Sequence, residues 1–142
     1  MAVYITHNKE ETVALGRRLA AYLTPGSVIA FTGGLGAGKT AFCSGIAQGL
    51  GCIDEATSPT FAIVNVYRGP QVFAHFDMYR INSLEDLYTT GFYDYMDSGA
   101  VVAAEWSENI AEFLDEPFIK VDIAHVDENT RRITIIGIDA LQ

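Results

Sequence analysis

Residues 28–42 read VIAFTGGLGAGKTAF, and this stretch decides the fold. Gly33 is followed by four residues and then by Gly38, Lys39 and Thr40, which matches the pattern G-x-x-x-x-G-K-[ST] of phosphate-binding loops. A short apolar run precedes the loop, as expected of a buried strand, and a helical pattern follows it. The stretch therefore predicts a strand, a nucleotide-binding loop and a helix in direct succession.

The chemistry of a triphosphate explains these residue types. Glycines permit backbone conformations and close approach that a Cβ would obstruct, so successive N–H groups can converge on phosphate oxygens, with the N-terminus of the next helix behind them. We expect Lys39 to reach the β- and γ-phosphates of the nucleotide and the Thr40 hydroxyl to bind Mg²⁺. The residues expected to hold the nucleotide are Gly34, Leu35, Gly36, Ala37, Gly38, Lys39, Thr40, Ala41 and Thr60.

Two carboxylates at the ends of predicted strands are candidates for the metal site and for catalysis. Asp77 ends the run VFAHFD, and Glu105 ends the run VVAAE. We expect one to bind Mg²⁺ together with Thr40, and the other to orient the water that attacks the γ-phosphate. The sequence leaves the division of these roles open. Together with Lys39, Asp77 and Glu105 are the expected catalytic residues.

Three further positions each have a functional and a structural interpretation. Thr60 lies in TSPTF (57–61), which is either a segment ordered by the γ-phosphate or an ordinary turn leading into a strand. His75 lies on the same strand face as Asp77, where it either makes a structural hydrogen bond or contributes to the site. Trp106 either packs in the core or lies near the nucleotide.

The remaining elements follow from hydrophobic periodicity and turn signals. We expect a strand at 3–6, a helix capped by Asn8, a helix at 39–50, a hairpin of strands 60–67 and 72–79, a helix capped by Ser83, a packed surface turn at 91–97, a strand at 100–106, a helix from Ser107, and a final pair of strands around 127–129. This order predicts one α/β domain over residues 1–142, a three-layer sandwich whose mixed sheet includes an antiparallel hairpin.

The charge is unevenly distributed along the chain. Residues 1–81 contain six Lys and Arg against five Asp and Glu, whereas residues 82–142 contain three against thirteen. An acidic second half disfavours direct wrapping on nucleic acid, and it suits either a basic protein surface or a solvated face. We see no membrane span or signal peptide, and Cys43 and Cys52 have no metal or redox spacing, so we expect a cytoplasmic protein with reduced thiols.

Five motifs together resemble the TsaE family, the small bacterial P-loop ATPases of tRNA threonylcarbamoyladenosine synthesis. They are GGLGAGKT (33–40), SPTF (58–61), HFDMYR (75–80), DLYTTGFYDY (86–95) and AAEWSENI (103–110). The resemblance implies Mg²⁺-dependent ATP hydrolysis and association with the TsaD–TsaB pair, with tRNA contacted only through that complex. It also implies roles for the matching residues: the loop lysine and threonine are Lys39 and Thr40, the switch threonine is Thr60, the strand-end acid is Asp77, and the Glu-Trp pair is Glu105 and Trp106.

Two other functions remain as alternatives. A small-molecule kinase would share the loop, but it needs a lid and a pocket for the phosphate acceptor, and the chain has little sequence for either. A nucleotide-gated adaptor without significant hydrolysis is the second alternative. Of the arginines, we expect Arg68 and Arg80 near the site, while Arg131 and Arg132 begin the last strand.

Overall fold

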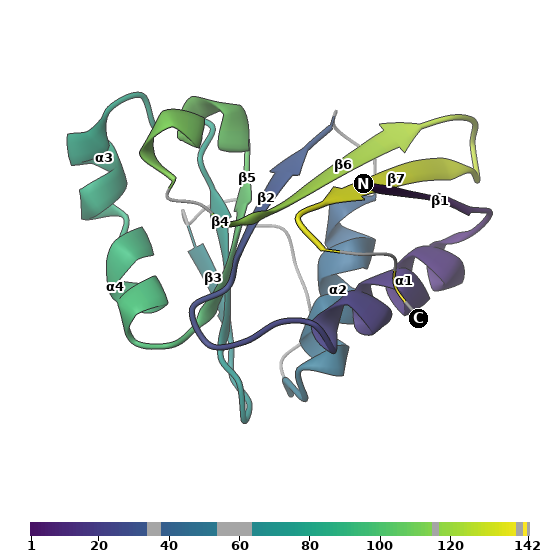
Figure 1. Cartoon of the computed structure of the whole chain (residues 1–142), viewed down its shortest axis with the longest axis horizontal. Helices are drawn as coiled ribbons and strands as arrows, with labels where there is room; N and C mark the ends of the chain where they lie inside the picture. The colour runs from purple at the N-terminus through teal and green to yellow at the C-terminus, as the bar shows by residue number, and fades with distance from the viewer. Residues whose placement is uncertain (34–37, 54–63, 115–116, 139–140, 142) are drawn as a thin grey trace.

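The fold is a seven-stranded mixed sheet with helices on both faces (Figure 1). The computed structural model describes residues 1–33, 38–53, 64–114, 117–138 and 141. In chain order the elements are β1 (Ala2–Thr6), α1 (Lys9–Ala20), β2 (Val28–Thr32), α2 (Lys39–Gly49), β3 (Val64–Tyr67), β4 (Phe73–Asp77), α3 (Leu84–Thr89), α4 (Phe92–Asp97), β5 (Val101–Glu105), two 3₁₀ turns (Ser107–Asn109 and Ala111–Phe113), β6 (Ile119–His125) and β7 (Arg131–Ile136). None of the described helices is both long and apolar enough to cross a membrane.

The strand order β1-β7-β6-β2-β5-β4-β3 determines where the site forms. Strand β2 lies between β5 and β6 and is parallel to both, and β4 is parallel to β5. The predicted hairpin is confirmed as the antiparallel pair β3–β4, and β7 pairs antiparallel with both β6 and β1. Because β2, β4 and β5 point the same way, the loop after β2 and the residues that end β4 and β5 share one edge of the sheet.

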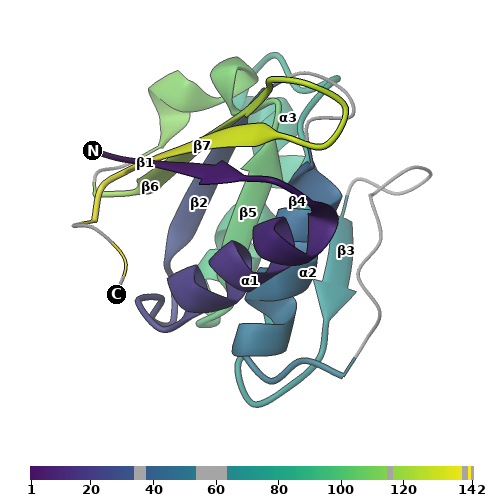
Figure 2. The ribbon, with the colours of Figure 1, turned by 90° about the vertical axis from the view of Figure 1, so that its right-hand side faces the viewer.

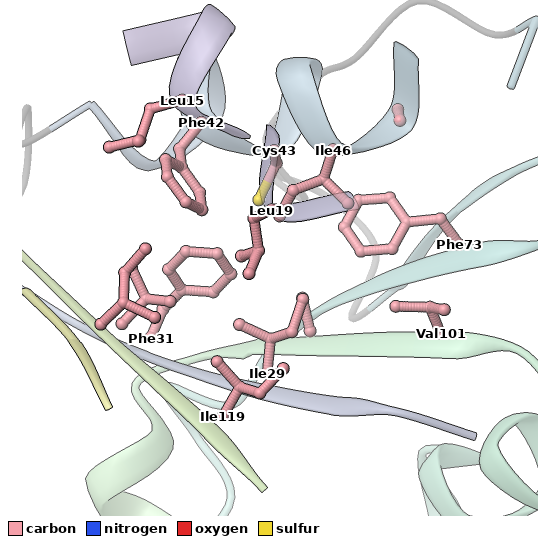
Figure 3. Close-up of a cluster of buried hydrophobic side chains, with 14 of the residues drawn as sticks. Leu15, Leu19, Ile29, Phe31, Phe42, Cys43, Ile46, Phe73, Val101 and Ile119 are labelled. Atoms are coloured by element: carbon pink, nitrogen blue, oxygen red, sulfur yellow. The ribbon is translucent and has the colours of Figure 1, made fainter. Parts of the chain in front are cut away.

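Two hydrophobic clusters, one on each face, hold the three layers together. Helices α1 and α2 cover the first cluster, where Leu15, Leu19, Phe42 and Ile46 face the sheet (Figure 3). Helices α3 and α4 and the 3₁₀ turns cover the second. Successive residues of each central strand alternate between the clusters, as Val101 and Val102 do in β5. This double burial explains why the central strands read as continuous apolar runs.

Helix α1 begins as its sequence predicts and lies directly against α2 (Figure 2). The Asn8 side chain caps the helix by accepting a hydrogen bond of 2.8 Å from the backbone N–H of Glu11. The Glu11 carboxylate in turn accepts a bond of 2.8 Å from the N–H of His7. Gly16 on α1 and Gly45 on α2 are both buried, and neither could carry a Cβ without meeting backbone atoms of the other helix. The two glycines therefore set a close approach between these helices.

The expected surface turn at 91–97 is wrong, because the segment forms helix α4. Gly91 has φ of 86°, a left-handed conformation that suits glycine, and it starts the helix. Phe92 then turns into the second cluster, where its ring meets Phe76 at a centroid distance of 5.4 Å. Burial of this side chain stabilises a short helix that its acidic and aromatic composition did not indicate.

The helix expected from Ser107 is instead two short 3₁₀ turns. Trp106, just before them, has φ of 58°, which is unusual for a residue with a side chain. The Ser107 hydroxyl donates to the carbonyl of Phe31, and the Asn109 amide donates to the carbonyl of Met78, both at 2.9 Å. These bonds tie the segment to the ends of β2 and β4, so tertiary contacts override the helical pattern.

Candidate functional site

The loop lysine and the carboxylate at the end of β5 meet at the carboxyl edge of the sheet. Lys39 is the first residue of α2, and its Nζ donates to the carbonyl oxygen of Gly33 at 3.1 Å. The same Nζ lies 3.5 Å from Oε1 of Glu105, and both side chains are largely buried. The structure thus brings together two of the three predicted catalytic residues.

His75 binds the other oxygen of the same carboxylate. Its Nε2 lies 3.0 Å from Oε2 of Glu105, and the ring is fully buried. The Sγ of Cys43, on α2, lies 4.0 Å from the same Nε2. His75 therefore belongs to the site, and the two oxygens of Glu105 have different partners.

The pKa values of this pair shift in opposite directions. Burial acts to lower the pKa of His75, but the Cys43 sulfur and the Glu105 carboxylate outweigh it and raise that pKa from 6.5 to about 10. For Glu105, burial acts to raise the pKa, but the hydrogen bond and charge of His75, together with the charge of Lys39, lower it below 4.5. Glu105 is consequently a carboxylate at neutral pH, held between two cationic groups.

Asp77 lies beside Glu105 at the same edge of the sheet. The two residues are partners in the parallel pairing of β4 with β5. Oδ1 of Asp77 accepts a bond of 3.0 Å from the backbone N–H of Tyr79, which holds the carboxylate at the end of its own strand. The two predicted acids are therefore neighbours at this edge of the sheet, and Glu105 contacts Lys39.

Trp106 extends the site towards the surface. Its ring centroid lies 5.8 Å from the Lys39 ammonium, within the range of a cation–π contact. Tyr79 packs edge-on against the same ring at 4.9 Å, and Tyr79 is 58% exposed. The indole thus contacts Lys39 and also packs on the second hydrophobic cluster, as the core interpretation expects; its location near the nucleotide stays a prediction.

The start of α2 has the chemistry that phosphate groups require. Gly38 is the N-cap residue with φ of 103°, and the first turn contains Lys39 but no acidic residue. Thr40 and Ala41 follow in that turn, with Thr40 exposed. An ammonium group at the N-terminus of a helix favours a polyanion. Of the predicted nucleotide-binding residues, Gly34, Leu35, Gly36, Ala37 and Thr60 lie outside the described residues.

The side chains present also fit Mg²⁺ bound together with a nucleotide. The hydroxyl of Thr40 and the carboxylates of Asp77 and Glu105 are oxygen ligands, which this ion prefers. Among the described residues, no group of three or more His, Cys, Asp or Glu side chains could hold a metal ion alone. Mg²⁺ usually binds through one or two carboxylates and the phosphates of its substrate, so the hydroxyl and carboxylates named above would hold it together with a nucleotide.

Arg131 lies by Gly38, the residue that caps α2, which the sequence did not indicate. A Cβ built on Gly38 would lie 3.8 Å from Nε of Arg131. The Nη1 of this arginine donates to the carbonyl of Asp127 at 2.8 Å, which fixes the side chain on the β6–β7 turn. No local pattern could have revealed this contact, because it depends on β6 pairing with β2 and on β7 folding back along β6.

Comparisons with known proteins agree with this geometry. Residues 6–133 match the family "Threonylcarbamoyl adenosine biosynthesis protein TsaE". The chain is 35% identical to the tRNA threonylcarbamoyladenosine biosynthesis protein TsaE of Treponema pallidum over 131 residues, covering 92% of this chain and 97% of that protein. It is 37% identical to the TsaE protein of Bacillus subtilis over 135 residues, covering 94% and 84% of the two chains.

A solved structure extends the likeness to three dimensions. The crystal structure of Bacillus subtilis YdiB superposes with a TM-score of 0.74 at 33% identity, covering 94% of this chain and 83% of that one. The similarity therefore extends over most of the fold. The chain belongs to the TsaE family.

Proposed function

We propose that this protein binds and hydrolyses ATP with Mg²⁺, and that its nucleotide state controls association with the TsaD–TsaB pair that modifies tRNA. The observation that supports this most directly is the position of Lys39. Its ammonium group lies at the start of the helix that follows the loop, between the Gly33 carbonyl and Glu105. Membership of the TsaE family supports the pathway, because the matching relatives are named for threonylcarbamoyladenosine biosynthesis.

Binding of ATP requires Lys39 to exchange partners. Its ammonium group lies 3.5 Å from Oε1 of Glu105, which neutralises its charge. The β- and γ-phosphates offer a stronger negative charge, and the N-terminus of α2 attracts them to the same place. Thr40, with Asp77 or Glu105, would hold Mg²⁺, which when bound neutralises charge on the phosphates.

Hydrolysis then needs a water that a carboxylate holds in line with the γ-phosphate. The water oxygen forms a bond to the γ-phosphorus as the bond from that phosphorus to the β,γ-bridging oxygen breaks. The electron pair of the broken bond stays on ADP, and the proton of the water passes to Asp77 or Glu105 before inorganic phosphate leaves. Both acids stand at the correct edge, since their strands pair there in register.

The acidic second half supports a protein partner over a nucleic acid. Residues 81–119 contain nine Asp and Glu and neither Lys nor Arg. They include α3, α4 and both 3₁₀ turns, and the 3₁₀ turns begin directly after Trp106. Five of these acids, Glu85, Asp94, Asp97, Glu108 and Glu112, are exposed, and exposed acids attract a basic protein face and repel phosphate backbones. Because the 3₁₀ turns follow Trp106 directly, a partner bound to them would lie near the proposed nucleotide site.

A nucleotide-dependent pull-down tests the proposal. The protein is mixed with TsaD and TsaB of the same organism, with and without Mg-ATP, and ADP formation is followed in parallel. We expect a complex that requires the nucleotide in the wild type, none with Lys39→Ala, and normal behaviour of Lys9→Ala, an exposed lysine on α1. The proposal fails if nucleotide changes neither the complex nor ADP formation. Hydrolysis that occurs only with a small-molecule acceptor would indicate a kinase instead.

A further inference from the structure

We propose that His75 is a positioning residue that holds Oε2 of Glu105 in place, while Lys39 is the exchangeable partner of Oε1. When ATP draws Lys39 away, Oε1 becomes available to the reaction, and the carboxylate keeps its orientation through His75. This inference rests on the proposed hydrolysis of ATP and assigns a role that the loop motif does not. It applies whether Glu105 binds the metal or orients the water, because both roles need a fixed carboxylate.

The backbone fixes His75 with respect to Glu105. Their strands β4 and β5 are parallel neighbours, and the register pairs His75 with Ala103, two residues before Glu105. The Glu105 side chain therefore reaches back along the strands to meet Nε2 at 3.0 Å. A carboxylate oxygen can only accept, so the imidazole donates Nε2–H to it.

The surroundings of the ring prevent it from moving. His75 has no exposed surface, and it stacks on Phe73 with ring centroids 6.5 Å apart and planes 12° from parallel. Cys43 contacts it from α2. A closely packed ring of this kind is a rigid hydrogen-bond donor, whose angle and distance to Glu105 are set by the core.

Packing alone does not account for a histidine at this position. Its Nδ1 has no hydrogen-bond partner in the described part of the chain, and a buried polar atom without a partner is destabilising. An apolar side chain would fill the space without that cost. The contact with Glu105 is the strong polar interaction that the ring makes, and it explains why a polar residue occupies this position.

Lys39 makes a weaker and more adaptable contact. Its Nζ lies 3.5 Å from Oε1, longer than a strong charge-assisted hydrogen bond, and it also donates to the Gly33 carbonyl. The long flexible stem lets the ammonium move between partners at little change in the core. The two oxygens of Glu105 are thus unequal: Oε2 is held by a rigid group, and Oε1 by a mobile one.

The test compares His75→Phe with His75→Gln, because the amide nitrogen of Gln can replace Nε2 as a donor. For each variant we measure kcat and KM for Mg-ATP, and ATP affinity from the fluorescence of Trp106, the only tryptophan. We expect His75→Phe to lower kcat by roughly 10- to 100-fold, as loss of orientation does, with ATP affinity within about twofold of wild type. His75→Gln should recover most of kcat.

The outcomes separate this inference from the proposed function. If the wild type forms no ADP with or without TsaD–TsaB, the proposed function fails. If it does, and a folded His75→Phe matches its kcat or loses only ATP affinity, the positioning role is wrong. Should His75→Phe fail to fold, His75→Asn replaces it, since its shorter side chain does not bring the amide to the Nε2 position. Equal kcat values for His75→Asn and His75→Gln would then overturn the inference.

Discussion

Replacing Gly45 with Ala should destabilise the protein, although the same change in an isolated helix is stabilising. Gly45 lies within α2 on the side that faces α1, and it is buried. A Cβ at this position would lie 2.9 Å from the backbone nitrogen of Arg17 and closer still to the carbonyl oxygen of Val13. These are backbone atoms of the other helix, so no side-chain rotation can relieve the contact.

The sign of the effect follows from two opposing terms. Gly to Ala in a helix contributes about 1 kcal/mol of stability through backbone entropy. Ordinary contacts of a Cβ begin at 3.4 Å, so α1 and α2 must separate by more than the half ångström that the Arg17 contact requires, because the Val13 oxygen is closer still. Overpacking of this kind costs about 1–3 kcal/mol, and a clash with rigid backbone falls at the upper end. We expect a net loss of about 1–2 kcal/mol, which lowers the melting temperature by roughly 3–8 °C.

Thermal and urea unfolding of the purified protein measure this loss. Ser44→Ala is the matched control, because it places alanine on the adjacent position of the same helix, where the side chain is only partly buried. Its stability should change by less than about 0.5 kcal/mol. Because α2 begins at Lys39, displacement of the helix should also weaken ATP binding. A Gly45→Ala protein that melts as high as the wild type would refute the close approach of the helices.

Two further predictions concern charge at the site. The contribution of His75 to stability should be complete below pH 6.5 and should be lost as the pH rises towards about 10, because its pKa is raised on folding. The free energy of unfolding of His75→Gln should therefore be about 3 kcal/mol below that of the wild type near pH 6. This difference, measured by urea unfolding, should shrink by pH 9. Arg131→Ala should raise the Kd for ATP roughly tenfold in calorimetry, which is the effect of losing one charged contact. The reason is that Nε of Arg131 lies by Gly38. Arg132→Ala should not, because that exposed side chain points to the opposite face of β7; equal effects would contradict this placement.

Much of the fold could be predicted because its signals are local. The central strands read as apolar runs since both of their faces are buried, and Asn8 caps α1 through a bond to a residue only three positions away. Helix α4 was missed for the opposite reason. Its stability comes from Phe92 packing on Phe76 of a distant strand, and no local pattern reports that contact.

The sequence identified residues of the candidate site but not which of them contact one another. Lys39 was identified by the loop motif, and Asp77 and Glu105 by their places at strand ends. That β4 and β5 are neighbours, and that His75 therefore meets Glu105, depends on the order of strands in the sheet. Sequence reasoning placed His75 on the correct face of its strand but could not name its partner, because strand order is set by contacts distant along the chain.

The charges at this edge of the sheet leave the buried lysine with a partner. A lysine without one would be costly to bury, and the Glu105 carboxylate, 3.5 Å from its ammonium group, offsets that cost. If Lys39 turns to the phosphates of ATP as we propose, Oε1 of Glu105 loses its partner, but Oε2 keeps its 3.0 Å contact with His75. Burial acts to raise the pKa of Glu105, and the hydrogen bond and charge of His75 act to lower it, so the residue remains a carboxylate with a fixed orientation. We therefore expect His75 to affect the rate of hydrolysis and not the affinity for ATP.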